Sequence, residues 1–218
     1  MLDIYLRAAK ERLLNAVLEA KFVDRSLRNV HPNTITLLSG VLGLVSASLV
    51  ATGLCRLGLL CWLLNRLLDG LDGTVARRYG KQSDFGGYLD IVVDFSVYAA
   101  LPVAFSWFLE ADKLLWALTS LLEGVYFVNA AGLFYLAALL EKQEKDRILT
   151  GRQPQTAAKE LTSVPLPAAL VEGFESFLVM TLFFVFPTYS GFATLCTVMA
   201  LGVSISVGQR LAWAKRNL

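Results

Sequence analysis

The stretch ITLLSGVLGLVSASLVAT, residues 35–52, runs for 18 residues without a charged side chain. At about 1.5 Å per residue, a helix of this length nearly crosses the roughly 30 Å hydrocarbon core of a membrane. The preceding residues, His31-Pro32-Asn33-Thr34, supply a helix-breaking proline and a candidate N-cap. The stretch therefore predicts a first transmembrane helix.

Further apolar blocks follow along the chain, each bounded by polar residues, glycine or proline. Of the 218 residues, 56% are hydrophobic and 17% are charged, which excludes an ordinary soluble domain and a disordered chain. The pattern predicts an all-α, polytopic membrane protein with one domain over residues 1–218 and a six-helix transmembrane bundle over residues 33–212. The expected later spans are residues 54–79, 87–109, 114–140, 166–186 and 191–212.

Residues 1–30 alternate apolar and charged side chains at helical spacing, which predicts an amphipathic helix on the membrane surface. The segment lacks the apolar core and cleavage site of a secretory signal, so we expect it to be retained. Most of the 20 basic residues fall on one side of the predicted topology. By the positive-inside rule, both termini are expected to face the cytoplasm.

Charge and cysteine usage exclude other classes. A formal net charge of +2, without clustered basic and aromatic residues on a soluble surface, argues against binding to nucleic acid. Cys55, Cys61 and Cys196 lie in apolar runs without CxxC spacing or a neighbouring histidine. We therefore expect packing roles for them and neither a disulfide framework nor a zinc site.

Carboxylates interrupt the second and third predicted spans. Asp69 and Asp72 lie near the end of one span, and Asp90 and Asp94 lie near the start of the next. An ionisable group inside a membrane costs a few kcal/mol or more, so each marks a candidate functional site. Helical spacing places each pair on one face, and the two faces can converge in the cytoplasmic half.

Four carboxylates at one depth repel one another unless cations neutralise them. Clusters of carboxylate oxygens suit hard divalent ions such as Mg²⁺, Mn²⁺ or Ca²⁺. The alternative is a network of buried ion pairs with Arg66, Arg77 and Arg78, but three arginines leave four aspartates with a net negative charge. The residues therefore predict a site for a pair of divalent ions.

These residues also form a longer pattern with fixed spacing, which is Asp69-x2-Asp72-Gly73-x2-Ala76-Arg77-x8-Gly86-x3-Asp90-x3-Asp94. The pattern resembles the signature of the CDP-alcohol phosphatidyltransferase family at every fixed position. From average residue usage, the probability of a chance match at a given start is on the order of 10⁻¹⁰. The resemblance extends to the six-span layout, and residues 64–78 and 172–175 are most similar to short bacterial members.

The resemblance implies transfer of a phosphatidyl group from CDP-diacylglycerol to a small polar alcohol, with release of CMP. It implies a homodimer in a bacterial inner membrane, with its active site at the cytoplasmic face. It also implies two divalent ions, Mg²⁺ or Mn²⁺, and direct displacement. By the same resemblance Asp69, Asp72 and Asp90 are metal ligands, and Asp94 is the general base and a further candidate ligand.

Small residues of the pattern suit a nucleotide site. Gly73, Ala76 and Gly86 would let cytidine or phosphate approach a helix backbone closely, although small residues also serve helix packing. The guanidinium of Arg77 can pair with a phosphate, or it can anchor the helix end among lipid headgroups. We predict that these four residues bind the nucleotide and its phosphates.

The acceptor is expected to contact the remaining cytoplasmic polar groups. A basic loop before the fifth span suits a phosphorylated acceptor, although topology alone also explains such charges. Glu172 and Glu175, one turn apart in the predicted fifth span, are candidates for binding acceptor hydroxyls or for pairing with Arg66. In relatives that use inositol phosphate an arginine tends to follow the first glutamate, whereas here Gly173 stands there. The candidate acceptor-binding residues are Glu172, Glu175, Lys142, Arg147 and Arg152.

Two other functions remain open at this level. The first is a phosphotransferase that uses CDP-choline or CDP-ethanolamine with a diacylglycerol acceptor, although such relatives are usually longer. The second is a divalent-cation transporter, which would need charged groups on both sides of the midplane. His31 lies in a loop and the cysteines are remote from the aspartates, so we find no candidate for a covalent nucleophile.

Overall fold

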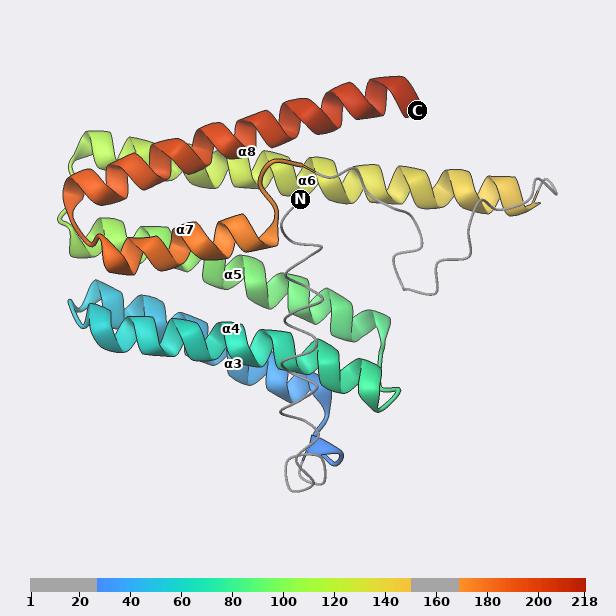
Figure 1. The fold of residues 1–218 in the computed structure, drawn as a ribbon, viewed down its shortest axis with the longest axis horizontal. Coiled ribbons are helices and arrows are strands. Elements are labelled where there is room, and N and C mark those ends of the chain that lie inside the picture. Colours follow the sequence, from blue (N-terminus) through green and yellow to red (C-terminus); the bar gives the residue numbers. More distant parts are fainter. Residues whose placement is uncertain (1–26, 150–168) are drawn as a thin grey trace.

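The structure is a computed structural model that describes residues 27–149 and 169–218. Within these ranges the chain forms α-helices and no strand (Figure 1). The amphipathic helix expected over residues 1–30 lies almost wholly outside the described residues. The helices are α3 (Pro32–Ala51), α4 (Cys55–Arg78), α5 (Asp84–Phe108), α6 (Lys113–Leu149), α7 (Gly173–Val185) and α8 (Tyr189–Asn217).

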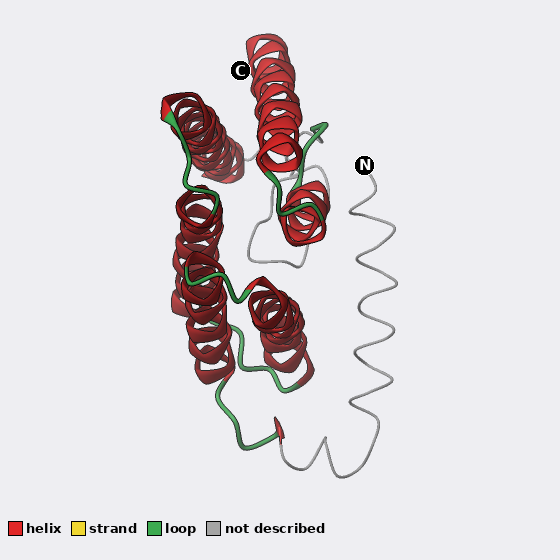
Figure 2. Cartoon of the chain, turned by 90° about the vertical axis from the view of Figure 1, so that its left-hand side faces the viewer, coloured by secondary structure: helices red, strands yellow, loops and turns green. Residues whose placement is uncertain are grey.

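The helices lie side by side with their axes in roughly one direction, as the nearly end-on view shows (Figure 2). By length and composition, α3, α5, α6 and α8 are able to cross a membrane. Helix α4 is 24 residues long but carries the ionisable groups of the second predicted span, and α7 is a shorter apolar helix of 13 residues. The protein is therefore an all-helical, polytopic membrane protein, which confirms the predicted fold class.

Helix α6 continues beyond the expected end of its span at residue 140 and reaches Leu149, the last residue described before the gap. The additional segment is polar, but it is composed mostly of residues with high helix propensity. Glu141 and Lys145 form an ion pair of 3.4 Å along it. The prediction ended the span where the hydrophobicity ended, whereas the helical hydrogen bonding continues past that point.

The fifth predicted span is shorter than expected: it was placed at residues 166–186, and helix α7 covers Gly173–Val185. Residues 166–168 lie outside the described residues, and residues 169–172 are not helical. In this segment the backbone N–H of Leu170 donates to Gln209 Oε1 and that of Val171 to Ser206 Oγ, each at 2.9 Å. Side chains of α8 thus satisfy backbone groups that a longer α7 would have used internally.

Helices α3, α4 and α5 pack closely because small residues line their contacts. Ser46 Oγ on α3 donates to the backbone carbonyl of Gly58 on α4 at 2.7 Å. A Cβ added at Gly43 of α3 would lie 2.7 Å from Val97 Cγ1 on α5, which is too close for two carbon atoms. Such contacts between small residues and backbone are typical of helix interfaces in membranes. They place α4 and α5 against the same helix.

At the other end of α5, aromatic side chains fill the space between α5, α7 and α8. Phe105 is fully buried, and its ring centroid lies 5.6 Å from that of Phe183, 5.0 Å from that of Phe184 and 5.8 Å from that of Phe192. Most of these pairs are edge-to-face, the arrangement that aromatic rings prefer. This aromatic cluster joins α7 and α8 to the end of α5 that lies farther from the aspartates.

Candidate active site

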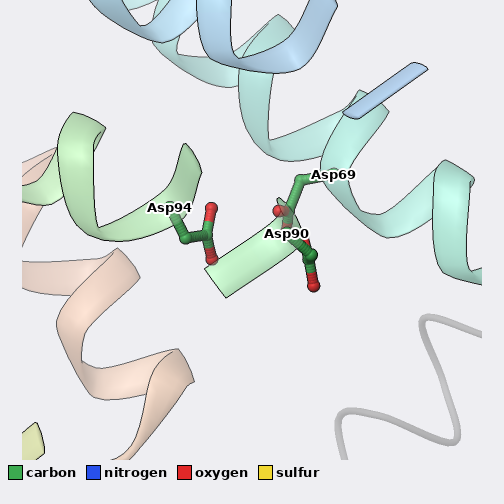
Figure 3. A group of neighbouring side chains, drawn as sticks. All are labelled: Asp69, Asp90 and Asp94. Carbon is green, nitrogen blue, oxygen red and sulfur yellow. The ribbon is translucent and has the colours of Figure 1, made fainter. Parts of the chain in front are cut away.

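Three predicted ligands meet between α4 and α5. Asp69 comes from α4, and Asp90 and Asp94 come from successive turns of α5. One oxygen from each carboxylate lies within 4.8 Å of the others. Figure 3 shows the three side chains directed toward the same space between the helices. The short turn between the helices places the end of α4 beside the start of α5, which brings the two parts of the motif together.

The fourth aspartate of the motif lies apart from this carboxylate cluster. Asp72 is only 5% exposed, and its Oδ2 accepts a hydrogen bond of 2.5 Å from Thr36 Oγ1 on α3. Its Oδ1 accepts from the backbone N–H of Gly73 at 2.5 Å. Three residues along a helix correspond to a rotation of about 60° between side chains. Asp69 therefore faces α5, whereas Asp72 faces α3.

Thr36 had no signal in the sequence that would single it out. It is an uncharged residue in an apolar span, and its hydroxyl also lies 3.3 Å from the carbonyl of Pro32. Its contact with Asp72 depends on how α3 packs against α4, which spacing along either helix does not give. Sequence reasoning therefore missed the hydroxyl that orients Asp72.

A cleft of about 150 Å³ opens beside the carboxylate cluster. Asp72 and Asp90 line it, so it adjoins the cluster through a shared aspartate. Lys81 and Asn33 add polar groups that the sequence had not assigned. All four predicted nucleotide-binding residues, Gly73, Ala76, Arg77 and Gly86, also line this cleft.

The two motif glycines keep the cleft narrow but open. A Cβ at Gly86 would lie 3.1 Å from Ser83 Oγ and 3.2 Å from Asn33 Oδ1. A Cβ at Gly73 would lie 3.3 Å from a terminal nitrogen of Arg77. Any larger side chain at Gly73 or Gly86 would therefore push the neighbouring atoms away. Both glycines border the cleft, where a phosphate could enter.

The cluster is compatible with a divalent cation. Its donors are carboxylate oxygens, the ligands that Mg²⁺ and Mn²⁺ prefer. Arg66 on α4 pairs with Asp94 at 2.7 Å and with Asp69 at 3.7 Å, so it offsets part of the negative charge. A divalent ion bound by the three carboxylates would neutralise further negative charge. The residues present therefore fit a divalent ion, and the pair of ions expected from the sequence stays a prediction.

The predicted acceptor residues are distributed differently from the expectation. Glu172 and Glu175 were expected inside a span, but Glu172 is the N-cap of α7 and Glu175 lies in its first turn. The Glu175 carboxylate accepts from the backbone N–H of Glu172 at 3.1 Å, in a reciprocal capping box. Arg66, considered as their partner, pairs instead with Asp69 and Asp94.

The structure says less about the three basic residues predicted to bind the acceptor. Lys142 is exposed on the polar extension of α6. The side chain of Arg147 and the whole of Arg152 lie outside what the structure describes. The proposed contact between these residues and an acceptor therefore stays a prediction.

Comparison with known proteins identifies the family. The profile of the CDP-alcohol phosphatidyltransferase family matches residues 29–206, which include every helix of the carboxylate cluster and the cleft. The chain belongs to this family. The match also covers Arg66 and Thr36, which lie outside the motif itself.

The similar proteins include an inner membrane protein and a bifunctional transferase and synthase. The inner membrane protein YnjF of Escherichia coli is 38% identical over 105 residues, which cover 48% of each chain. The bifunctional IPC transferase and DIPP synthase of Thermococcus kodakarensis is 34% identical over 83 residues, or 38% of this chain and 19% of that protein. The matched segment thus spans about half or less of these relatives.

A solved structure shares the fold over nearly the whole chain. The crystal structure of phosphatidylinositol phosphate synthase from Mycobacterium tuberculosis with CDP-DAG bound superimposes with a TM-score of 0.61 at 18% identity, covering 93% of this chain and 92% of that one. A second structure of the same synthase, in complex with manganese and citrate, gives a TM-score of 0.59 at 17% identity, covering 93% and 87%. At this identity the likeness concerns the fold.

Proposed function

We propose that this protein transfers a phosphatidyl group from CDP-diacylglycerol to a small polar alcohol and releases CMP. The observation that carries the proposal is the meeting of Asp69, Asp90 and Asp94 beside a cleft lined by the other motif residues. Membership of the family supports a CDP-linked donor. The CDP-DAG bound to the mycobacterial synthase of the same fold supports the diacylglycerol form of that donor.

Asp69, Asp90 and Asp94 would hold divalent ions, Mg²⁺ or Mn²⁺, and Asp72 would complete the ligand set from the α3 side. Bound divalent ions would neutralise the pyrophosphate oxygens and the charge that develops on departing CMP. Gly73, Ala76 and Gly86 would admit the nucleotide phosphates to the cleft, and the guanidinium of Arg77 would pair with them.

Asp94 is the proposed general base. One of its carboxylate oxygens would accept the proton of the acceptor hydroxyl as the hydroxyl oxygen attacks the phosphorus that bears diacylglycerol. A new phosphorus–oxygen bond forms, the bond to CMP breaks, and CMP leaves with that electron pair. The Asp94 side chain is 28% exposed, so it is accessible to an acceptor.

We further propose a bacterial inner-membrane location, with both termini and the cleft at the cytoplasmic face. The basic residues near the cleft support this orientation, and the name of the similar E. coli protein supports the location. By resemblance to the family we expect a homodimer, as in the sequence-based prediction.

The experiment measures CMP release by the purified protein with CDP-diacylglycerol and Mg²⁺ or Mn²⁺. The acceptors offered are glycerol phosphate, inositol, inositol phosphate, serine and a glycerol-headed lipid. We expect CMP only with a metal and one acceptor class, and a loss of about 10²- to 10⁴-fold in Asp94→Asn, the range expected for a general base. Asp84→Asn, an exposed aspartate on the same helix, is the matched control.

Other outcomes would redirect the assignment. CMP release that requires CDP-choline or CDP-ethanolamine with diacylglycerol would favour the second phosphotransferase class. Transport of Mn²⁺ into vesicles without CMP release, with all acceptors and donors tested, would overturn the transferase proposal. A normal rate in Asp94→Asn would remove Asp94 as the base.

The acceptor contacts need their own test. We propose that Glu172, Glu175, Lys142, Arg147 and Arg152 contact the acceptor, as the sequence predicted. Replacing Lys142 or Arg152 by glutamine should raise the KM for a phosphorylated acceptor and leave the KM for CDP-diacylglycerol unchanged. An equal change in both KM values, or in neither, would argue against this role.

A further inference from the structure

Arg66 lies against the carboxylate cluster, but it is outside the family pattern, which begins at Asp69. It is one turn earlier on α4, and its side chain is only 11% exposed. One terminal nitrogen lies 2.7 Å from Asp94 Oδ1 and the other lies 3.7 Å from Asp69 Oδ2. The planar guanidinium thus bridges carboxylates on two helices, a geometry that a lysine could not reproduce.

Two aromatic rings hold the guanidinium in place. The Arg66 Cζ atom lies 4.8 Å from the ring centroid of Trp62 and 5.2 Å from that of Tyr98. Trp62 is fully buried, and its Nε1 donates to Thr181 Oγ1 on α7 at 2.9 Å. The ring faces add cation–π attraction to the ion pairs and restrict the guanidinium to one position.

A hydrogen-bonded asparagine fixes the remaining side of Arg66. The Nε of Arg66 donates a hydrogen bond to Asn65 Oδ1 at 2.6 Å. Asn65 is fully buried, and its Nδ2 donates to the Ser39 carbonyl at 2.8 Å and to Ser39 Oγ at 2.9 Å. Ser39 Oγ in turn donates to the Asn65 carbonyl at 3.0 Å. The chain of contacts from Ser39 through Asn65 and Arg66 to Asp94 therefore joins α3, α4 and α5.

We propose that Arg66 is a positioning residue and the built-in cation of the site. It holds Asp94 through Oδ1, so that Oδ2 is the oxygen that accepts the acceptor proton, and it supplies positive charge to the side of the cluster nearest Trp62. The positioning part rests on the proposed transferase function. The charge part concerns metal binding alone and stands independently of turnover.

The two parts predict effects of opposite sign. A fixed positive charge close to the cluster weakens the binding of a divalent ion, so Arg66→Gln should bind Mn²⁺ about tenfold more tightly. The same variant leaves Asp94 without its anchor, and misplacing a catalytic group by about 1 Å can cost about 100-fold in kcat. A variant that was merely misfolded would lose both properties and could not gain metal affinity.

Arg66→Lys separates charge from geometry. Lysine keeps the positive charge, so the Mn²⁺ affinity should stay within about threefold of wild type. It lacks the planar fork that bridges two carboxylates, so kcat should still fall by about 100-fold. The KM for CDP-diacylglycerol should change little in either variant because Arg66 does not line the cleft.

The experiment uses the full chain in detergent or nanodiscs. Mn²⁺ affinity is measured by electron paramagnetic resonance, and kcat and KM are measured by CMP release. Arg56→Gln, an exposed arginine on the same helix, is the matched control. The proposal predicts tighter Mn²⁺ binding with slower turnover in Arg66→Gln, and unchanged binding with slower turnover in Arg66→Lys.

Each other outcome has a definite meaning. If Arg66→Gln binds Mn²⁺ more weakly, by a factor similar to its loss of turnover, Arg66 is a purely structural residue and the proposal is overturned. Unchanged turnover in both variants would overturn the positioning part. If wild type releases no CMP but Arg66→Gln binds Mn²⁺ more tightly, the transferase assignment fails and the built-in cation is supported. If Arg66→Gln does not fold, a loss of Mn²⁺ affinity in Arg66→Lys would overturn the charge part.

Discussion

The two ends of helix α5 are stabilised by different means. Near its start, Asp90 and Asp94 lie in a cluster of like charges, and Arg66, which pairs with Asp94, is held by aromatic rings and an asparagine. Near its end, Phe105 is fully buried against other aromatic rings. The first environment depends on the position of each polar atom, whereas the second depends on buried area and close packing.

This difference separates function from stability within one helix. A cluster of carboxylates in a membrane protein costs free energy unless cations accompany it, which fits the metal-binding role proposed for it. The aromatic cluster has no chemistry to perform and supplies packing energy. Substitutions at the two ends should therefore change different measured quantities, and the following experiments test that separation.

The largest effect is expected at the carboxylate cluster. Asp90→Asn should lower acceptor-dependent CMP release by about 10³-fold, because a metal ligand supplies several kcal/mol of transition-state stabilisation. The upward shift of melting temperature that Mn²⁺ gives the wild type should be lost, as it is in wild type with EDTA. Asp84→Asn is the control, and a retained Mn²⁺ shift in Asp90→Asn would contradict the ligand assignment.

The next effect concerns the aromatic end. Phe105→Ala should lower the free energy of unfolding by about 3–5 kcal/mol, the usual cost of truncating a buried phenylalanine. Reversible unfolding in mixed micelles measures it. The folded fraction should bind Mn²⁺ with wild-type affinity because the cluster is at the other end of α5. Phe127→Ala, which removes a ring that is 73% exposed, should change stability by less than about 1 kcal/mol. A parallel loss of Mn²⁺ affinity in Phe105→Ala would show that the two ends are coupled.

A smaller effect distinguishes close from open helix contacts. An added Cβ at Gly43 would overlap the γ-carbons of Val97, a stiff β-branched side chain, so Gly43→Ala should cost about 1–3 kcal/mol. Gly124 on α6 has nothing within 4 Å of an added Cβ, so Gly124→Ala should be neutral or gain up to about 1 kcal/mol from helix propensity. Equal effects in the same unfolding assay would contradict the close packing of α3 on α5.

The smallest effect is expected in the loop that joins the end of α5 to α6. The backbone N–H of Leu115 and the hydroxyl of Tyr189 donate to Asp112 Oδ1 at 2.9 and 2.8 Å, and they lower the pKa of that carboxyl. A lowered pKa in the folded state means that the stabilisation is full above the unfolded value of about 4 and is lost as the pH falls through the folded value. At pH 7 the wild type should therefore melt at a slightly higher temperature than Asp112→Asn, and this difference should shrink toward pH 3. Tyr189→Phe removes one of the two donors to Asp112, so it should lose part of the same stabilisation. A difference in melting temperature that grew toward acid pH would contradict the lowered pKa of Asp112.

The sequence predicted the helices and the meeting of carboxylates from α4 and α5, because both depend on local patterns. Apolar blocks of sufficient length fix where the helices lie, and the spacing of Asp90 and Asp94 fixes that they share a face. Local patterns were less reliable at helix ends. Helix α6 continues through polar residues, and α7 begins at Gly173 because α8 binds the preceding backbone.

Thr36 and Arg66 mark the limit of what spacing can give. The motif determined by itself that carboxylates of α4 and α5 could meet. Only the packing of α3 decided that Asp72 turns to Thr36, and only the close approach of α5 decided that Arg66 pairs with Asp94. Periodicity specifies the direction of a side chain around its own helix, whereas its partner depends on which neighbouring helix fills that direction, and neighbours far apart in sequence are fixed only by tertiary packing.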